Sequence, residues 1–371
     1  MKMNRLFIPL MVILVLASCK EKQEAILSEE VVETVKETFK FWTWITADAS
    51  RTDSSYKEEF EKYHAHGITA VLINTEADPE LLARLSPIAL KAGLEVHAWM
   101  FTVNRPGDKI ALQHPDWYQV SRSGKSCFDD RPYVDYYQWL SPSHPDARKH
   151  ILSLVAGLAE VQEISSVHLD YIRYPDVYLP IGLLPKYNLK QETELPDFDF
   201  DYSDAAVEKF MQIHQKNPRE MENPAIDMEW KNFRLNEIRS LVNEAYKVVH
   251  EKGKYLTAAV FPYPEMADHM VRQRWDKRDI EDVLPMKYNN FYEEEVYWVG
   301  YATKQGVTDL QAKDVELHTG LYVPEMSAED LKTAIQLAHD NGAKGVSFFD
   351  GPAITEEQLQ VIKAKSEAFQ P

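Results

Sequence analysis

The chain has 371 residues, with 59 acidic residues against 41 basic ones and a formal net charge of -18. So negative a chain argues against a nucleic-acid partner and against electrostatic docking to anionic lipid. It also disfavours a polyanionic substrate, unless a basic cleft overrides the overall charge locally.

The first residues are typical of a targeting segment. Lys2 and Arg5 accompany an apolar run at residues 6–16, which is too short to span a bilayer. The Leu-Ala-Ser-Cys tetrapeptide that ends at Cys19 resembles a bacterial lipobox, which implies cleavage before Cys19 and lipidation of its thiol. We therefore expect a signal peptide at residues 1–18 and a lipid-anchored protein of the bacterial cell envelope, on the periplasmic or surface face of the outer membrane. An ordinary signal peptide with an incidental cysteine is the alternative.

A charged tether is expected to precede one folded domain. Residues 19–39 are rich in Glu, Lys, Val and Thr and contain neither Gly nor Pro. Residues 40–371 have a length that single α/β barrels commonly occupy. With Cys19 assigned to lipid, Cys127 is the only thiol left, which excludes an intrachain disulfide and a cysteine-based metal site.

Short apolar runs of β type alternate with helical patterns along this domain. The expected strands are residues 41–46, 69–74, 95–102, 166–174, 255–261, 282–288, 316–323 and 345–349. Helical spacing is found at residues 56–66, 79–92, 145–161, 230–251 and 328–340. Helix ends are expected at Gly67, Gly93, Gly253, Gly306 and Gly342. This alternation predicts an α/β fold, a (β/α)8 TIM barrel with its active site on the loops that follow the strands.

The connections after the third and fourth strands are long. Residues 176–228 contain several prolines, an acidic and aromatic piece at 197–204, and a short helix expected at 205–216. Loops of this length in a compact domain usually carry function or cover a site. We expect them to form the walls of a substrate cleft, with lineage-specific decoration as the alternative.

The segment VHLDYIRYP at residues 167–175 indicates where the chemistry lies. His168 and Asp170 share a face of the fourth strand, and Asp170 falls near its C-terminal end, where barrels keep their catalytic groups. Asp170 is the first catalytic candidate, and a structural Asp that caps the next loop or holds Arg173 is the alternative. His168 either orients that carboxylate or fills the barrel with a satisfied hydrogen bond.

A second carboxylate is expected just beyond the fifth strand. Glu265 follows the run Phe-Pro-Tyr-Pro, one βα unit after Asp170, and two carboxyl groups that flank a scissile bond are the requirement of glycoside hydrolysis. Glu325 and Asp350, after the seventh and eighth strands, are its rivals.

Aromatic and polar residues at the strand ends favour a carbohydrate substrate, because flat rings cover the apolar faces of sugars while amides and charges bind hydroxyls. The expected substrate-binding residues are Trp42, Trp44, Asn74, Trp99, His168, Tyr171, Arg173, Tyr288, Asn289, Glu325 and Asp350.

Motifs for other chemistries are absent from the sequence. We find no glycine-rich phosphate loop, no HExxH pair, no regular spacing of Asp typical of a calcium loop, and no GxSxG elbow. The sequence therefore predicts no cofactor and no metal.

Three motifs resemble one known family. HLDYIRYP at residues 168–175, WKNFR at 230–234 and LPMKY at 284–288 resemble glycosyl-hydrolase-like family ten, also called the DUF187 type, and the similarity covers most of residues 41–351. The resemblance implies a (β/α)8 barrel, often secreted or lipid-anchored in bacteria, and one branch of the family cleaves peptidoglycan glycan strands.

The chain departs from that pattern at two places. FPYPE at residues 261–265 and MVRQRW at 270–275 are more similar to a Bacteroidetes branch of glycosidases, and a related group includes endo-fucanases that use an Asp and a Glu. This resemblance implies Asp170 and Glu265 as the catalytic pair and makes a sulfated fucan a possible substrate.

The resulting hypothesis is a lipid-anchored glycoside hydrolase that acts on a polysaccharide or peptidoglycan glycan strand, with the long loops favouring an endo mode. A non-catalytic glycan-binding lipoprotein on the same barrel is the alternative.

Overall fold

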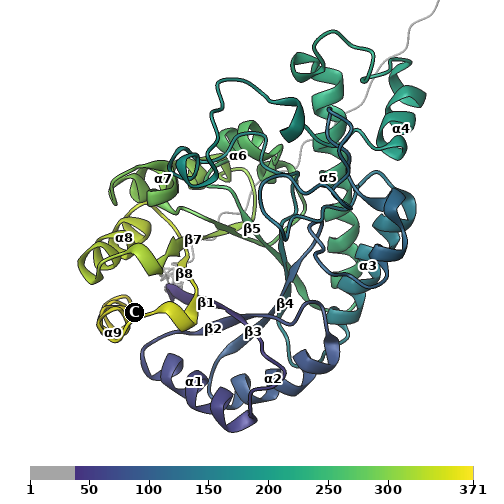
Figure 1. The fold of residues 1–371 in the computed structure, drawn as a ribbon. Coiled ribbons are helices and arrows are strands. Elements are labelled where there is room, and N and C mark those ends of the chain that lie inside the picture. Colours follow the sequence, from purple (N-terminus) through teal and green to yellow (C-terminus); the bar gives the residue numbers. More distant parts are fainter. Residues whose placement is uncertain (1–37, 371) are drawn as a thin grey trace, which may run out of the picture. The chain divides into compact units, whose positions relative to one another are not determined.

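The computed structural model describes residues 38–370. In this part of the chain, eight parallel strands pair in sequence order and close into a barrel (Figure 1). The strands are β1 (Lys40–Thr46), β2 (Ala70–Asn74), β3 (Glu95–Phe101), β4 (Ser166–Asp170), β5 (Tyr255–Val260), β6 (Asp282–Pro285), β7 (Glu316–Tyr322) and β8 (Gly345–Phe349). The predicted TIM barrel is confirmed. The predicted signal peptide, Cys19 and the tether up to residue 37 lie outside the described residues.

Helices surround the barrel. They are α1 (Asp53–Ala65), α2 (Pro79–Lys91), α3 (Pro145–Ala159), α4 (Asp204–His214), α5 (Met228–His250), α6 (Pro264–Val271), α7 (Trp298–Asp309), α8 (Ala328–Asp340) and α9 (Glu356–Ala368). Most begin at a Ser, Thr or Asp whose side chain accepts a hydrogen bond from a first-turn backbone N–H, as at Asp78 and Thr355. None of the helices in residues 38–370 is long and apolar enough to cross a membrane.

Three helices were not predicted, and one glycine was misread. The sequence pattern did not indicate α6, α7 or α9, and Gly306 does not end a helix but lies inside α7. A Cβ at Gly306 would come 2.9 Å from Cδ1 of Leu317, so the missing side chain allows α7 to pack closely on β7. Gly67 and Gly342, by contrast, have the left-handed φ values of +84° and +90° that helix stops require.

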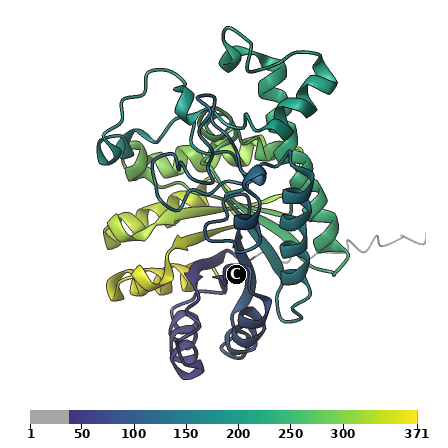
Figure 2. The ribbon, with the colours of Figure 1, turned by 45° about the vertical axis from the view of Figure 1, so that its right-hand side comes forward.

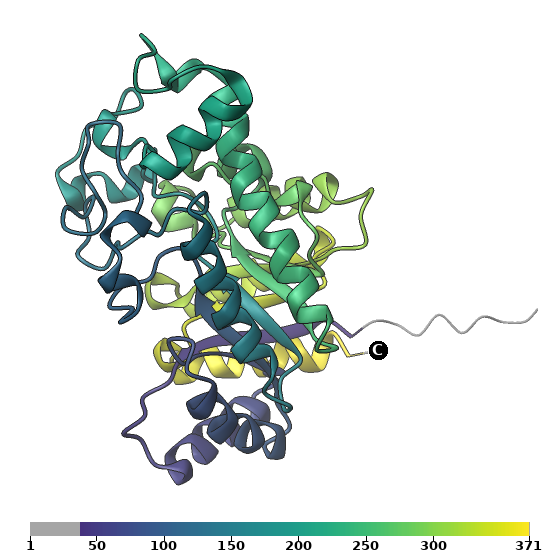
Figure 3. The same ribbon diagram turned by 90° about the vertical axis from the view of Figure 1, so that its right-hand side faces the viewer.

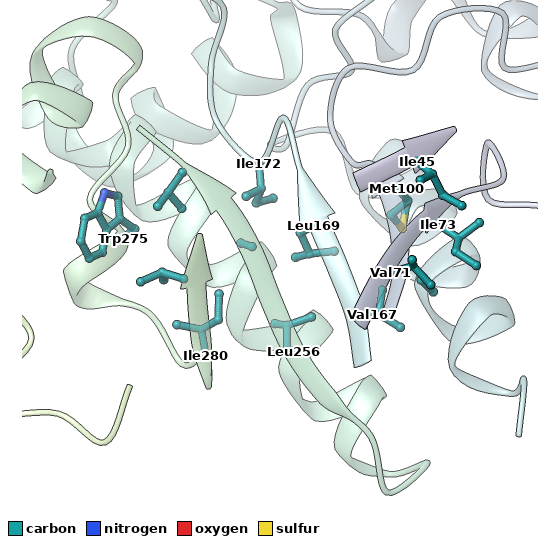
Figure 4. Close-up of a cluster of buried hydrophobic side chains, with 14 of the residues drawn as sticks. Ile45, Val71, Ile73, Met100, Val167, Leu169, Ile172, Leu256, Trp275 and Ile280 are labelled. Carbon is teal, nitrogen blue, oxygen red and sulfur yellow. The ribbon is translucent and has the colours of Figure 1, made fainter. Parts of the chain in front are cut away.

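The period-two alternation of the strands separates two apolar layers. Side chains such as Ile73, Leu169 and Leu256 belong to the large buried cluster, part of which Figure 4 shows. The intervening residues, including Trp44 and Leu72, form a second cluster inside the barrel. Each such side chain contributes about 1.5–3 kcal/mol by leaving water.

The segments after β3 and β4 are the long connections that the sequence predicted. Residues 102–144 and 171–203, dark blue and teal, gather at the end of the barrel away from the C-terminus (Figure 3), while α4 and the start of α5 extend beyond the ring of helices (Figure 2). Asp199 anchors the second segment. Its buried carboxylate accepts hydrogen bonds from Arg234 at 2.6 Å, Arg272 at 2.8 Å and Tyr202 at 2.8 Å.

Candidate active site

A cavity of about 300 Å³ lies at the C-terminal ends of the strands. Because all eight strands are parallel, their carboxyl ends and the loops that follow them meet at this one face. The cavity is lined by Trp44, Tyr133, Tyr136, Tyr137, Asp170, Tyr171, Arg173, Asp176, Pro180, Leu183, Lys186, Tyr187, Ala259, Phe261, Met286, Tyr288, Phe291, Tyr292, Tyr322 and Phe349. The lining is mostly aromatic, with a few charged groups.

Asp170 is the last residue of β4 and is partly accessible from the cavity. Its Oδ1 accepts a hydrogen bond from the backbone N–H of Tyr171 at 2.7 Å, and its Oδ2 accepts one from the indole N–H of Trp99 at 3.2 Å. Burial raises the pKa of Asp170 to about 6, although these two donors and the charge of Arg173 oppose the shift. A carboxyl group that keeps its proton to about pH 6 is suited to donate it.

The chain turns sharply after Asp170. We expected the strand to continue to residue 174, but β4 ends at Asp170 because Tyr171 has φ +50°, in the left-handed region. A bulky residue rarely adopts this conformation, and such strain is often found at functional sites. The turn brings Arg173 and Asp176 back to the cavity wall.

Asp176 is a second carboxylate of the cavity. It is buried, and its Oδ2 accepts hydrogen bonds from the hydroxyls of Tyr133 at 2.6 Å and Tyr137 at 2.9 Å and from Arg173 at 3.4 Å. All three contacts reach the same oxygen. Within residues 38–370, no hydrogen bond to Oδ1 accompanies them.

Arg173 has two roles in this arrangement. Its guanidinium pairs with Asp176 and lies 4.9 Å from the ring centre of Phe261 and 5.2 Å from that of Tyr171. The buried cation thus neutralises a buried carboxylate and joins two aromatic walls of the cavity.

His168 supports the floor of the cavity. Its Nε2 accepts a hydrogen bond from the indole N–H of Trp44 at 3.2 Å, so the other ring nitrogen carries the proton and donates it to Oγ1 of Thr257 at 2.8 Å. Burial holds the pKa of His168 well below its usual value, so the ring is neutral. Among the described residues His168 makes no hydrogen bond to Asp170; it fixes the orientation of Trp44 instead.

Several residues expected at the site lie around the cavity rather than in its lining. Trp99 contacts Asp170 from behind, and Asn74 accepts a hydrogen bond from the backbone N–H of Glu76. Trp42 is buried deeper in the barrel, stacked on His318 with ring centres 4.2 Å apart.

The loops after β6 to β8 hold three more of the expected residues outside the lining. Asn289 donates to the backbone carbonyl of Glu294, and the exposed Glu325 accepts from the side chain of Asn290 at 2.6 Å. Asp350 is half-buried, and burial raises its pKa.

Glu265 is not among the residues that line the cavity with Asp170. It lies in the first turn of α6, is exposed, and does not line the cavity. A carboxylate at the start of a helix is stabilised by the positive end of the helix dipole. The carboxylate that does reach the cavity with Asp170 is Asp176.

Sequence reasoning missed the tyrosines of the loop after β3 and Asp176 itself. Tyr133 and Tyr137 are separated from Asp176 by 43 and 39 positions in the sequence. Two signals in the sequence could have indicated them. Three tyrosines lie within residues 133–137, and Asp176 directly follows the RYP of the strand-four motif.

One group of metal-ligating side chains lies close together in residues 38–370, at the opposite end of the barrel: Asp282, Glu316 and His318. The sequence, which contains no metal-binding motif, predicted no metal site there.

The barrel is similar to those of known glycosidases. The catalytic domain of β-amylase from Paenibacillus polymyxa aligns with a TM-score of 0.63 at 12% identity, over 91% of this chain and 100% of that one. The PgaB (BpsB) glycoside hydrolase domain from Bordetella bronchiseptica aligns with a TM-score of 0.62 at 13% identity, over 89% and 97%. A β-galactosidase from Marinomonas ef1 aligns with a TM-score of 0.64 at 10% identity, over 89% and 59%. At such identities the likeness shows the fold alone.

A search of curated proteins found no match. The profile of the family described as Glycosyl hydrolase-like 10 matches residues 29–323, which confirms the resemblance carried by the three sequence motifs. Because this match spans well over half of the chain, the protein belongs to the Glycosyl hydrolase-like 10 family.

Proposed function

We propose that the protein hydrolyses glycosidic bonds of a glycan, with Asp170 as the proton donor. The observation that carries the proposal is the position of Asp170, a carboxyl group with a pKa raised to about 6, in a cavity walled by aromatic side chains. Membership of a glycosyl-hydrolase-like family supports a glycan as the substrate.

In the proposed reaction, the protonated Asp170 transfers its proton to the glycosidic oxygen as the bond from that oxygen to the anomeric carbon breaks. The sugar develops oxocarbenium-like positive charge, which a nearby carboxylate stabilises or captures. Water then supplies the hydroxyl group of the new reducing end, and its remaining proton restores the acid.

Asp176 is the second carboxylate of this proposal. It lines the same cavity as Asp170, and the Arg173 charge and two tyrosine hydroxyls hold it in place. Glu265, which the sequence favoured for this role, lies outside the cavity lining. Retention or inversion of the anomeric configuration follows from how far apart the two carboxyl groups lie in the complex with substrate.

Aromatic walls and long loops support an extended substrate. Rings such as Tyr288, Tyr322 and Phe349 lie beside one another, with centres 5.4 to 6.3 Å apart, and can cover the apolar face of a sugar. These walls favour endo cleavage of a polysaccharide. The candidate polysaccharides include a peptidoglycan glycan strand and a sulfated fucan. Release of only terminal sugars would contradict it.

Anchoring to the cell envelope is a further part of the proposal, supported by the lipobox-like sequence at residues 16–19. Mass spectrometry of the mature N-terminus should find a lipid-modified Cys19, and the Cys19→Ala variant should be released into the soluble fraction. An unmodified N-terminus beyond Cys19 would contradict the anchor.

A glycan-binding protein without turnover is the second candidate. One observation favours it. Three donors, Tyr133, Tyr137 and Arg173, hold Oδ2 of Asp176 in place, whereas a carboxylate that attacks a sugar needs freedom to move toward the anomeric carbon. Such a protein would bind a glycan through the aromatic walls and release nothing.

The deciding experiment measures new reducing ends from a panel of polysaccharides that includes denuded peptidoglycan glycans and sulfated fucans. Wild-type protein is compared with Asp170→Asn, which keeps the shape but cannot donate the proton. Loss of a general acid should lower kcat by about 10²- to 10⁴-fold while binding persists. Cleavage unaffected by Asp170→Asn would reject the role of Asp170. Binding without any cleavage by the wild type would favour the glycan-binding candidate.

A further inference from the structure

A second cluster of polar side chains lies at the N-terminal end of the barrel. It consists of Asp282 on β6 with Glu316 and His318 on β7, whose potential ligand atoms all lie within 4.8 Å of one another. Asp282 and Glu316 are register partners across the seam between the two strands. His318 is two residues beyond Glu316, so it shares that face of β7.

His318 is the residue that indicates an absent ligand. Its ring is fully buried, yet neither ring nitrogen has a hydrogen-bond partner among residues 38–370. A buried polar group without a partner costs about 1–3 kcal/mol. Trp42 stacks on the ring with centres 4.2 Å apart and fixes its plane. The imidazole is therefore held by Trp42 beside the carboxylates of Asp282 and Glu316, but it makes no hydrogen bond to either of them.

The distances in the cluster suit a metal ion better than hydrogen bonds. Nε2 of His318 lies 3.6 Å from Oε2 of Glu316 and 4.0 Å from Oδ2 of Asp282, too far for hydrogen bonds. Bonds of about 2.0–2.2 Å from a tetrahedral ion would place its ligand atoms roughly 3.4 Å apart. A small contraction of the observed cluster reaches this geometry.

The charges around the cluster favour a cation. Carboxylates of Glu95, Asp282 and Glu316 all act on the ammonium group of Lys40, which lies 2.7 Å from Oε2 of Glu316. More negative than positive charge is thus gathered at this point. The Lys40 side chain is 39% exposed, so it can turn to solvent when another cation takes its place.

The cluster spans the shortest pairing in the barrel. β6 and β7 share two register pairs, Asp282 with Glu316 and Val283 with Leu317, and one further bridge follows between Met286 and Gly320, whereas β1 and β2 share five pairs. A cross-link between these strands would strengthen the seam that backbone pairing supports least. Residues at the N-terminal face of a TIM barrel usually contribute to stability rather than to catalysis.

We propose that Asp282, Glu316 and His318 form a structural site for one divalent transition-metal ion, and that the ion displaces the ammonium group of Lys40 from Glu316. One imidazole with two carboxylates suits zinc and its neighbours, whereas calcium and magnesium prefer oxygen ligands alone. The proposal does not depend on the glycosidase function.

Zinc is the probe for the test. Chelator-treated protein is titrated with ZnCl₂ while bound metal is counted and thermal unfolding is recorded. We expect one ion per chain and a rise in Tm, with glycan binding or cleavage unchanged. His318→Gln should lower zinc affinity at least about tenfold, and Lys40→Met, which removes the competing cation, should raise it. The opposite signs of these two effects identify the site.

His97→Gln is the matched control. His97 is also buried against Trp42, with ring centres 4.3 Å apart, and its Nε2 also lacks a hydrogen-bond partner among the described residues. Its Nδ1, however, is hydrogen-bonded to Oγ of Ser166 at 2.6 Å, and it is not one of the three proposed ligands, so zinc affinity should stay near that of the wild type. If His318→Gln does not fold, Glu316→Gln at a half-buried position should show the same loss. A wild-type protein that takes up no zinc, or an His318→Gln or Glu316→Gln variant that binds it normally, would overturn the proposal.

Discussion

The two ends of the barrel use polar residues in different ways. At the C-terminal end, Asp170 and Asp176 lie on an open cavity, and donors from loops and strands engage them. At the N-terminal end, His318 is buried without a hydrogen-bond partner in the described part of the chain, between carboxylates on strands that pair over only a few residues. The C-terminal arrangement can act on a substrate that enters from solvent, and the N-terminal one can hold a permanently bound ion.

This difference shows why the loops matter more than the strands for the proposed chemistry. Strand positions alone supply Asp170, but Tyr133, Tyr137 and Asp176 come from segments that fold over the barrel. Those segments depend on buried contacts of their own, above all on Asp199.

Removal of the charge on Asp199 should lower the free energy of unfolding substantially. Asp199→Asn leaves the buried guanidinium groups of Arg234 and Arg272 without this anionic partner, and breaking such a pair costs about 3–5 kcal/mol. Urea unfolding measures the loss. Asp197→Asn is the control, because its ion pair with Lys125 is exposed and is worth about 1 kcal/mol or less. Equal losses in the two variants would contradict the anchoring role of Asp199.

The pH dependence of cleavage should follow Asp170. Burial raises its pKa to about 6, so the proton that it donates is present below that pH and is lost as the pH rises. The value of kcat/KM should fall about tenfold per pH unit above 6, hence about a hundredfold by pH 8. A profile measured with one substrate decides this. An activity that rises from pH 6 to pH 8 would show that Asp170 does not act as the acid.

Loss of one donor to Asp176 should have a moderate effect. Tyr137→Phe removes the hydroxyl that lies 2.9 Å from Oδ2, and a hydrogen bond to a charged group is worth about 1.5–3 kcal/mol. We expect kcat to fall by about tenfold or more. Tyr136→Phe is the control, since Tyr136 lines the same cavity but makes no hydrogen bond to Asp176. Identical kinetics for both variants would argue against a catalytic role for Asp176.

The smallest effect is expected at Glu265. This carboxylate is exposed and outside the cavity lining, so Glu265→Gln should change cleavage by no more than about twofold. The same assay as for Asp170→Asn applies. A loss as large as that of Asp170→Asn would restore the pair that the sequence favoured and remove Asp176 from the mechanism.

Much of the fold was readable in the sequence because its signals are local. Short apolar runs of β type identified all eight strands, and glycines such as Gly67 and Gly342 identified helix ends. The helices α6, α7 and α9 were not predicted, and α6 has only eight residues. Gly306 misled because its absent side chain serves packing against Leu317 rather than a turn. Tertiary packing overrides local propensity at such positions.

The sequence by itself determined the barrel and the place of Asp170, because short apolar runs, helical spacing and the end of a run depend only on neighbouring residues. Only the tertiary structure decided which other side chains line the cavity with Asp170. Asp176 joins the cavity because the left-handed Tyr171 turns the chain, and Glu265 is left outside because it begins a helix. The approach of Asp282 to His318 likewise depends on strand register. Contacts between residues tens of positions apart result from the balance of burial and pairing over the whole domain, which no local pattern records.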